Sequence, residues 1–302
     1  MQKIIPCLWF EKDALEAAKF YASLFPASSV GTPTKYDEAS AKVSGMPEGS
    51  VLTVPFELAG QKFLALNGGP IFKFTPAVSF FVGCNTEEDI NWLYQNLSDG
   101  GKVLMEFQKY PFAEKYAWFN DKYGVSWQLM LSPYSQKITP MLMFTGDKYG
   151  KAKEAMDYYV SVFKERDKET KIKDVSYYSA GVKDATNKVV HGVFTLGGYD
   201  FMAMDSGEDH KFNFTMATSF MIECQNQEDI NYFWDKLSMS GKPSQCGWLE
   251  DRYGVAWQVV PTILDELLAD PDKAKAERTM KAMLNMTKLD IETLKKAYAN
   301  EI

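Results

Sequence analysis

The pattern of apolar and polar positions predicts a mixed fold in which strands and helices alternate. Residues 4–10 form an apolar run of strand length. Residues 13–25 then carry apolar side chains at helical spacing, and Pro26 ends that helix. A second helix is predicted over 85–97, with Thr86 as its N-cap. Further strands are predicted over residues 50–58, 61–67, 77–84, 116–121 and 125–131.

The same series of elements occurs twice in the chain. The phrase "DKYGVSWQLM" at 121–130 returns as "DRYGVAWQVV" at 251–260, and "EEDINWLYQNLSDGGK" at 87–102 returns as "QEDINYFWDKLSMSGK" at 227–242. The spacing between copies drifts with loop length, and the first copy has about ten extra residues between Lys102 and Trp118. The repetition predicts two homologous domains, residues 1–134 and 135–263.

Residues 264–302 form a C-terminal extension that is predicted to be helical. A first helix is predicted to begin at Asp270-Pro271-Asp272, with the proline at its first helical position, and a second to begin after 287–290. Each helix has an apolar stripe without a core of its own. We therefore expect the extension to dock on one of the domains or on another chain.

Composition and charge exclude several classes of partner. The chain has 302 residues, a formal charge of −7 and a pI near 5.1, so it has no basic excess with which to bind nucleic acid or an anionic membrane. Its four cysteines lie far apart without a C-x-x-C pair, and no apolar run of ~18 residues occurs. We expect a cytoplasmic protein with reduced thiols.

Several segments together resemble a known family. The segments "IIPCLWF", "GSVLTVPFELAGQKFLALNGGP", "FKFTPAVSFFVGC" and "QCGWLEDRYGVAWQVVPTIL" are similar to the PhnB-like branch of the vicinal oxygen chelate superfamily, which includes glyoxalases, bleomycin-resistance proteins and extradiol dioxygenases. Members of this branch are often labelled demethylubiquinone 3-methyltransferases. The resemblance implies an α+β fold with tandem glyoxalase-like domains, each built from paired βαβββ modules around a cup-shaped cavity.

The resemblance also implies a divalent metal at the floor of the cup, but the residues of this chain argue against one. Gln128 and Gln258 stand at positions where metal-binding relatives have a glutamate, and a neutral amide is a poorer ligand than a carboxylate. The opening strands offer Cys7 and Met141–Met143 in place of a histidine. We therefore expect no metal ligands and no cofactor, with a divalent metal as the less favoured alternative.

His191 and Asp205 are the candidate catalytic residues. His191 lies in a strand of the second domain, where the first domain has Thr53, and Asp205 ends the next strand, where the first domain has Asn67. The two side chains would suit proton transfer if they lay within hydrogen-bonding distance. A structural histidine and a polar strand terminus are the alternative interpretations.

The candidate ligand-binding residues are amides, aromatic rings and their neighbours. Trp127 and Trp257 alternate with Gln128 and Gln258, so tryptophans in the core would direct the glutamines into the cavity. There the amides would orient a ligand without charge, unless they bond only to the surrounding protein. The full set of predicted ligand-binding residues is Gln128, Gln258, Trp118, Trp248, Thr53 and Asn67.

Three functions follow from these observations. The first is binding of a small, partly apolar or aromatic molecule in a cup, without metal. The second is a lyase, isomerase or dioxygenase with its active site in the second domain around His191. The third is an interaction scaffold that uses the C-terminal helices, and homo-oligomers through these helices or through sheet edges are a related expectation. Methyl transfer is unsupported, because no glycine-rich turn connects a strand to a helix as a methyl-donor site requires.

Overall fold

The computed structural model describes residues 2–132, 138–179 and 186–302. The first repeat contains β1 (Ile4–Phe10), α1 (Ala14–Leu24), β2 (Ser29–Val30), α2 (Glu38–Ser44), β3 (Thr53–Leu58), β4 (Gln61–Asn67), β5 (Val78–Cys84), α3 (Glu87–Leu97), β6 (Lys102–Tyr110), β7 (Ala113–Asn120) and β8 (Ser126–Leu131). The expected boundary between residues 134 and 135 lies outside the described residues.

The second repeat follows the same order and leads into the C-terminal helices. It contains β9 (Ile138–Phe144), α4 (Ala152–Lys164), β10 (Lys171–Tyr177), β11 (Val189–Leu196), β12 (Tyr199–Asp205), β13 (Thr218–Cys224), α5 (Gln227–Leu237), β14 (Lys242–Pro243), β15 (Trp248–Glu250) and β16 (Ala256–Pro261). A 3₁₀ turn, Gly146–Lys148, precedes α4, and the extension forms α6 (Ile263–Leu268), α7 (Lys273–Leu284) and α8 (Ile291–Ala299).

Each of the two sheets combines strands from both repeats. The first sheet has the order β14-β15-β16-β13-β1-β4-β3-β2, and the second has the order β10-β11-β12-β9-β5-β8-β7-β6. The repeats join where β1 pairs antiparallel with β13 and β5 pairs antiparallel with β9. The expectation that paired modules of one repeat form one cup is therefore wrong, because each module pairs with a module of the other repeat.

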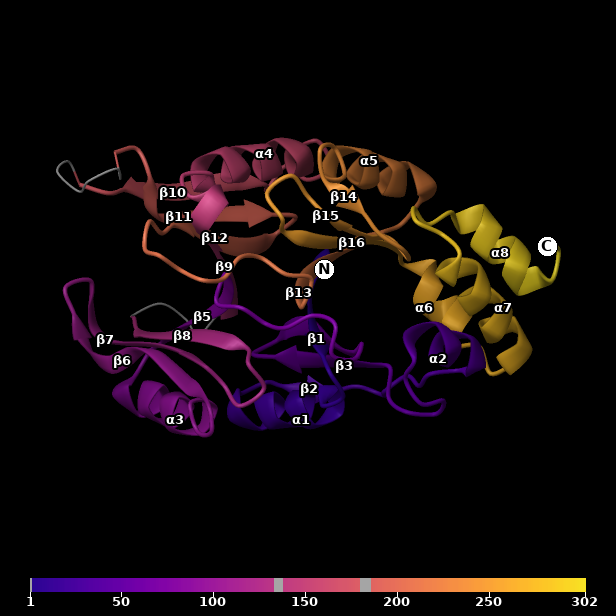
Figure 1. Cartoon of the computed structure of the whole chain (residues 1–302), viewed down its shortest axis with the longest axis horizontal. Coiled ribbons are helices and arrows are strands. Elements are labelled where there is room, and N and C mark those ends of the chain that lie inside the picture. The colour runs from indigo at the N-terminus through magenta and orange to yellow at the C-terminus, as the bar shows by residue number, and fades with distance from the viewer. Residues whose placement is uncertain (1, 133–137, 180–185) are drawn as a thin grey trace.

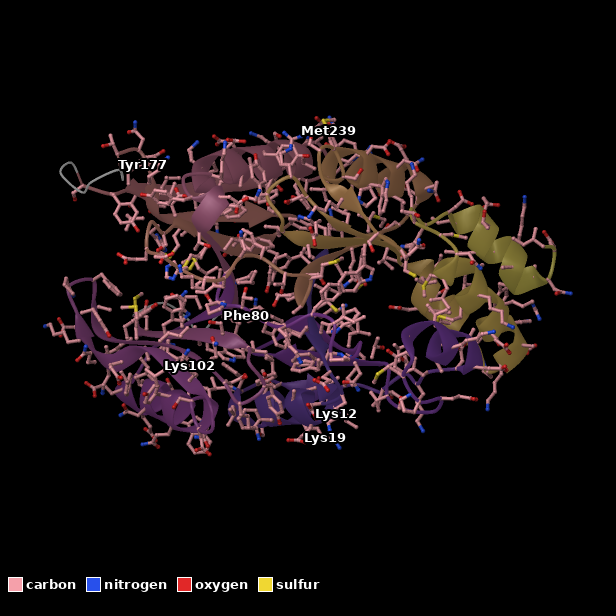
Figure 2. The ribbon with its side chains drawn as sticks, in the orientation of Figure 1. Lys12, Lys19, Phe80, Lys102, Tyr177 and Met239 are labelled. Atoms are coloured by element: carbon pink, nitrogen blue, oxygen red, sulfur yellow. The ribbon has the colours of Figure 1, made fainter. Side chains whose placement is uncertain are left out.

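The helices and the hydrophobic cores, in contrast, follow the repeats. In Figure 1, α1 and α3 cover the lower outer side of the molecule, and α4 and α5 cover the upper outer side. One core cluster joins mainly side chains of α1, α3 and strands of the first repeat, and another joins mainly α4, α5 and strands of the second repeat; Ile4, Val78 and Ile138 each belong to the cluster of the other repeat. Phe80 is buried, whereas Lys12, Lys19 and Lys102 are exposed; all four are labelled in Figure 2. We call the sheet face opposite these helices the inner face.

A buried aspartate gives the repeated phrase at 121–130 its structural role. Asp121 Oδ2 accepts hydrogen bonds from Tyr21 Oη at 2.6 Å and Trp127 Nε1 at 2.9 Å, while Oδ1 accepts from the backbone N–H groups of Tyr123 and Val125. The phrase thus supplies the aspartate, the turn and the tryptophan together. It ties the β7–β8 turn to α1, which covers the other sheet.

The second copy of the phrase builds the same network. Asp251 accepts from Tyr159 Oη at 2.7 Å and from Trp257 Nε1 at 2.9 Å, and it also accepts two backbone N–H groups. Burial raises the pKa of each aspartate to about 6, against the opposing effect of the four donors. Both repeats therefore depend on a carboxylate that is 3–4% exposed.

The C-terminal helices dock on their own chain beside the first sheet (Figure 1). They share a small core that includes Leu264 and Leu294, and α7 contacts α2 of the first repeat. The backbone N–H groups of Cys246 and Gly247 donate to carbonyls of the α7–α8 connection at 2.7 and 2.8 Å. No helix in the described part of the chain is long and apolar enough to span a membrane.

The extension occupies the place where the first repeat has a longer hairpin. The ten extra residues after Lys102 extend the β6–β7 hairpin, whereas the corresponding pair β14–β15 is short and lies next to the α7–α8 connection. The predicted start of α7 was wrong by two residues. Asp272 is the N-cap and accepts from Ala274 N, so Pro271 precedes the helix instead of occupying its first position.

Candidate functional site

The glutamines of the two repeated phrases lie on the inner faces of different sheets. Trp127 and Trp257 enter the two cores, and the alternation of a strand directs Gln128 and Gln258 to the opposite side. Both glutamines are buried, with exposed fractions of 4% and 6%. Their surroundings nevertheless differ, and this difference distinguishes the two inner faces.

In the second sheet, the polar groups on the inner face satisfy one another. Tyr116 Oη donates to Gln128 Oε1 at 2.7 Å, and Gln128 Nε2 donates to Ser79 Oγ at 2.8 Å. The neighbouring Trp118 Nε1 donates to Ser126 Oγ at 3.0 Å. Gln128 therefore has a structural role here, because both ends of its amide are bonded within the protein.

In the first sheet, the equivalent groups keep unused hydrogen-bonding capacity. Gln258 Nε2 donates to Ser219 Oγ at 3.0 Å, but the position of Tyr116 is taken by Cys246, whose Sγ lies 3.6 Å from the carbonyl of Met283. Ala256 replaces the serine that bonds the tryptophan in the second sheet. Among the described residues, no hydroxyl therefore reaches Gln258 Oε1 and no acceptor reaches Trp248 Nε1.

Aromatic rings surround this part of the first sheet. Trp248 pairs with Gln258 across β15 and β16, and its ring meets the ring of Trp9 edge-on at 5.9 Å. The ring of Phe72 also packs edge-on against Trp9 at 5.0 Å, and Trp9 Nε1 donates to the carbonyl of Gly69 at 2.9 Å. Trp9 is thereby held in place, and both tryptophans are partly exposed. We call Cys7, Trp9, Ser219, Trp248 and Gln258 the first-sheet cluster.

The first-sheet cluster does not fit a hard divalent metal ion. Cys7 is 1% exposed, and burial raises the pKa of its thiol to about 11 in spite of hydrogen bonds with Gln258 and Ser219. The cluster thus offers a protonated thiol, a hydroxyl and a neutral amide, none of which supplies negative charge. The described residues contain no group of three or more His, Cys, Asp or Glu side chains that could hold a metal.

Asp205 and Asn67 each accept backbone hydrogen bonds at the start of a helix, and neither lies on an inner face. Asp205 Oδ1 accepts from the N–H groups of Gly150 and Ala152 at the start of α4, and its Oδ2 accepts from Val189 N. The carboxylate is thus bonded to backbone donors and has no hydrogen bond to His191 among the described residues, so the catalytic pair inferred from the sequence stays a prediction.

The second repeat has an aspartate where the first has an asparagine because the neighbouring backbone group is a donor in one case and an acceptor in the other. Asn67 Oδ1 accepts from Ala14 N at the start of α1, as Asp205 does for α4. The other side-chain atom of Asn67 is Nδ2, which donates to the carbonyl of Val51 instead of accepting an N–H. A donor is needed there, so the amide replaces the carboxylate.

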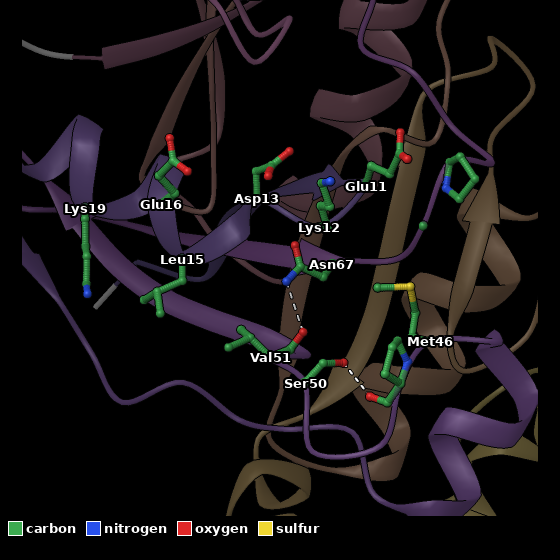
Figure 3. A pocket seen from close by; sticks show the side chains of 13 residues that line it. Glu11, Lys12, Asp13, Leu15, Glu16, Lys19, Met46, Ser50, Val51 and Asn67 are labelled. Carbon is green, nitrogen blue, oxygen red and sulfur yellow. Dashed lines mark hydrogen bonds between the residues drawn. The ribbon is translucent and has the colours of Figure 1, made fainter.

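Asn67 instead lines a surface pocket of about 700 Å³ (Figure 3). The pocket lies between the start of α1 and the segment from Met46 to Val51, and acidic and basic side chains mix along its wall. Its hydrogen bonds, including that from Asn67 to Val51, hold the wall together. The predicted ligand role of Asn67 therefore has no support from an unused polar group.

His191 and Thr53 occupy equivalent positions in different sheets, as the repeat predicts. His191 neighbours Gly192, which pairs with Ala203, and Thr53 neighbours Val54, which pairs with the corresponding Ala65. The Thr53 hydroxyl bonds to the Thr34 hydroxyl at 2.6 Å. His191 thus shares a sheet with Gln128 and Trp118, and Thr53 shares one with the first-sheet cluster.

A titration by NMR checks the surroundings of His191. Burial lowers the pKa of His191 below its usual value of 6.5, and the charge of Asp174 partly opposes this effect. We expect a midpoint below 6.5 in the wild type and a still lower midpoint in Asp174→Asn, because that variant removes the opposing charge. An unchanged or higher midpoint in the variant would contradict this assignment of causes.

The sequence alone did not single out several members of the first-sheet cluster. Cys7, Trp9 and Ser219 come together because β1 pairs with β13. These strands belong to different repeats, so considering one repeat by itself keeps the residues apart. The signal that could have found them is strand parity. Residues 5, 7 and 9 of β1 share the face opposite the core residues Leu8 and Phe10.

Sequence comparison finds one family twice along the chain. The sequence model of the family described as 3-demethylubiquinone-9 3-methyltransferase matches residues 2–130 and again residues 136–260. A Bacillus cereus protein described as a PhnB protein is 44% identical, over 43% of this chain and 100% of its own, with a TM-score of 0.40. A Staphylococcus aureus protein is 34% identical over 43% of this chain and 97% of its own, with a TM-score of 0.18.

A solved enzyme has a similar fold over most of the chain. Glyoxalase I from Zea mays is 10% identical over 89% of this chain and 98% of its own, with a TM-score of 0.53, a likeness of fold alone. No curated protein matches the chain. The family match covers both repeats, so the chain belongs to the 3-demethylubiquinone-9 3-methyltransferase-like (PhnB) family, which has the fold of the vicinal oxygen chelate superfamily.

Proposed function

We propose that the protein binds a small, partly aromatic molecule against the inner face of the first sheet, without a metal ion. The observation that carries this proposal is the difference between two equivalent pairs of residues. Gln128 is hydrogen-bonded to Tyr116, and Trp118 to Ser126. Gln258 and Trp248 lack the corresponding partners, and Gln258 keeps the bond to the serine of the adjacent strand. Unused donors and acceptors beside partly exposed rings are typical of a site that orients a ligand.

The chemistry of the first-sheet cluster defines the class of ligand. Trp9, Trp248 and Phe72 offer ring faces and edges to a flat apolar group. Gln258 Oε1 accepts a hydrogen bond and Trp248 Nε1 donates one, so the ligand carries both a donor and an acceptor. The first-sheet cluster is neutral, because the high pKa of Cys7 keeps its thiol protonated at pH 7. A neutral aromatic amide or a similar carbonyl compound meets these requirements.

A titration with benzamide, which combines a ring with an amide, tests the proposal. In ligand-observed NMR, we expect Gln258→Leu to weaken benzamide binding about tenfold, because the variant removes the acceptor and keeps the side-chain volume. The matched variant Gln128→Leu changes the same residue type on the other sheet and should change the affinity less than twofold.

The two variants also give the result that would overturn the proposal. Equal losses in Gln258→Leu and Gln128→Leu, or binding that survives both, would show that the open amide of the first sheet does not hold the ligand. Thermal unfolding of both proteins checks that each is folded. Trp248→Phe, compared with Trp118→Phe, repeats the test on the indole N–H.

The other functions inferred from the sequence stay predictions. His191 feels the charge of Asp174 but has no hydrogen bond or ion pair with a carboxylate among the described residues, so no specific observation favours an enzyme centred on it. The C-terminal helices dock on their own chain, which leaves a scaffold role without a particular observation in its favour. Methyl transfer, which the family's description names, is not part of the proposal.

A further inference from the structure

The second repeat contains a built-in receptor for a guanidinium group. Arg166 Nη1 lies 3.0 Å from Glu228 Oε1 and 3.4 Å from Asp229 Oδ1. The guanidinium carbon also lies 4.4 Å from the ring centre of Tyr232. Two carboxylates and an aromatic face on the first turns of α5 thus hold one arginine, which follows α4 in the chain.

The first repeat has the same three groups without the arginine. Glu88, Asp89 and Trp92 stand on α3 where Glu228, Asp229 and Tyr232 stand on α5, and Ser28 holds the position of Arg166. The difference has a local cause. Pro26 cannot extend α1 beyond its end at Leu24, and Ser28 instead accepts a hydrogen bond from Ala59 N.

A groove of about 340 Å³ lies between the end of α1 and the first turns of α3, beside Asp89 and Trp92. Trp92, which lines this groove, is 51% exposed. Tryptophan is the best aromatic partner for a cation, so the exposed ring is suited to hold one. Glu88 and Asp89 form no ion pair with any residue in the described ranges. The groove is lined by Ser23, Leu24, Phe25, Pro26, Asp89, Trp92 and Leu93.

The arginines of this chain are already engaged. The sequence contains Arg166, Arg252 and Arg278. Arg252 lies over the ring of Tyr158 at 4.4 Å, and Arg278 donates to two carbonyls of α8 at 3.0 and 2.9 Å. A second copy of this chain therefore has no spare guanidinium to offer. A lysine fits less well, because its compact ammonium does not match two carboxylates and a ring face at once.

We propose that this groove, formed by α3 and the end of α1, binds an arginine side chain of a different protein. The carboxylates of Glu88 and Asp89 pair with the guanidinium, and its flat face stacks on Trp92. The apolar stem of the arginine lies along Leu24, Phe25 and Leu93. The site is on the outer surface, so it is independent of ligand binding at the first-sheet cluster.

The indole N–H resonance of Trp92 reports on binding of capped arginine, Nα-acetyl-arginine amide. We expect a saturable shift, with capped lysine binding at least fivefold more weakly. The double variant Glu88→Gln, Asp89→Asn should weaken the binding of capped arginine at least tenfold. The control Glu87→Gln removes a charge from the same helix, but Glu87 is paired with Lys115, so its effect should stay below twofold.

The second repeat supplies a positive control. Arg166→Ala empties the receptor on α5, so capped arginine should then also shift resonances of Tyr232. The proposal is overturned if Trp92 shows no saturable shift, if lysine binds equally well, or if Glu87→Gln has the same effect as the double variant. Tighter binding of free arginine than of capped arginine would also overturn it, because the ligand would then be a free guanidinium compound.

Discussion

Asp251→Ala is expected to destabilise the protein by about 3–5 kcal/mol. The substitution leaves the buried Tyr159 hydroxyl, the Trp257 indole N–H and two backbone N–H groups without their common acceptor. Each unsatisfied buried donor costs about 1–3 kcal/mol, and the losses are not fully additive. Urea unfolding monitored by tryptophan fluorescence measures the change in the free energy of unfolding.

The first repeat supplies a matched variant for this prediction. Asp121→Ala removes the same four hydrogen bonds and should cost a similar amount. Tyr159→Phe removes one donor and keeps the acceptor, so its cost should be near 1 kcal/mol. A loss below about 1 kcal/mol in Asp251→Ala would show that the network does not hold α4 to the β15–β16 turn.

Gly241→Ala is expected to cost about 2–3 kcal/mol for a different reason. A Cβ atom at residue 241 would lie 2.2 Å from the carbonyl oxygen of Glu250, which is backbone and cannot rotate away. The strands β14 and β15 must then separate next to Asp251, so the strain reaches the buried network. The same close approach exists in the first repeat, where a Cβ at Gly101 would lie 2.1 Å from the carbonyl oxygen of Asn120.

Gly207→Ala is the control for this backbone contact. A Cβ there would first meet the ring of Tyr149 at 3.0 Å, and a side chain can move aside. We expect Gly207→Ala to cost less than 1 kcal/mol in the same urea experiment. If Gly241→Ala and Gly207→Ala have equal costs, the close approach of the two strands is not what requires glycine at residue 241.

Local pattern predicted the elements of the fold well. The strand predicted over 4–10 and the helix predicted over 13–25 correspond closely to β1 and α1. The cap at Thr86 is present, since its hydroxyl accepts from Asp89 N at 3.1 Å. These features depend on side-chain periodicity and on contacts within a few residues, which a sequence displays directly. The short helix α2 has no such periodicity and was not predicted.

The candidate site was harder to predict because it depends on which residues meet. The duplication, the family and the alternation of tryptophan with glutamine can be read from the chain. The sequence could not show that Gln128 is bonded to Tyr116 and Ser79, whereas Gln258 donates to Ser219 and lies beside Cys7. Both glutamines stand in nearly the same local phrase, so their difference comes from residues contributed by other strands.

The sequence by itself determined the tandem repeat and the order of strands and helices, because repeated periodic patterns and helix-capping residues are local properties, and its motifs carried the resemblance to the PhnB family. Only the tertiary structure decided that each sheet takes one module from each repeat, since the pairing of β1 with β13 and of β5 with β9 joins segments far apart in the chain. That pairing places Cys7 beside Gln258 and separates Gln258 from His191. Long-range strand pairing therefore decides which polar atoms remain unused. Backbone hydrogen bonds between strands are the same for many sequences, so the sequence alone does not show which strands become neighbours.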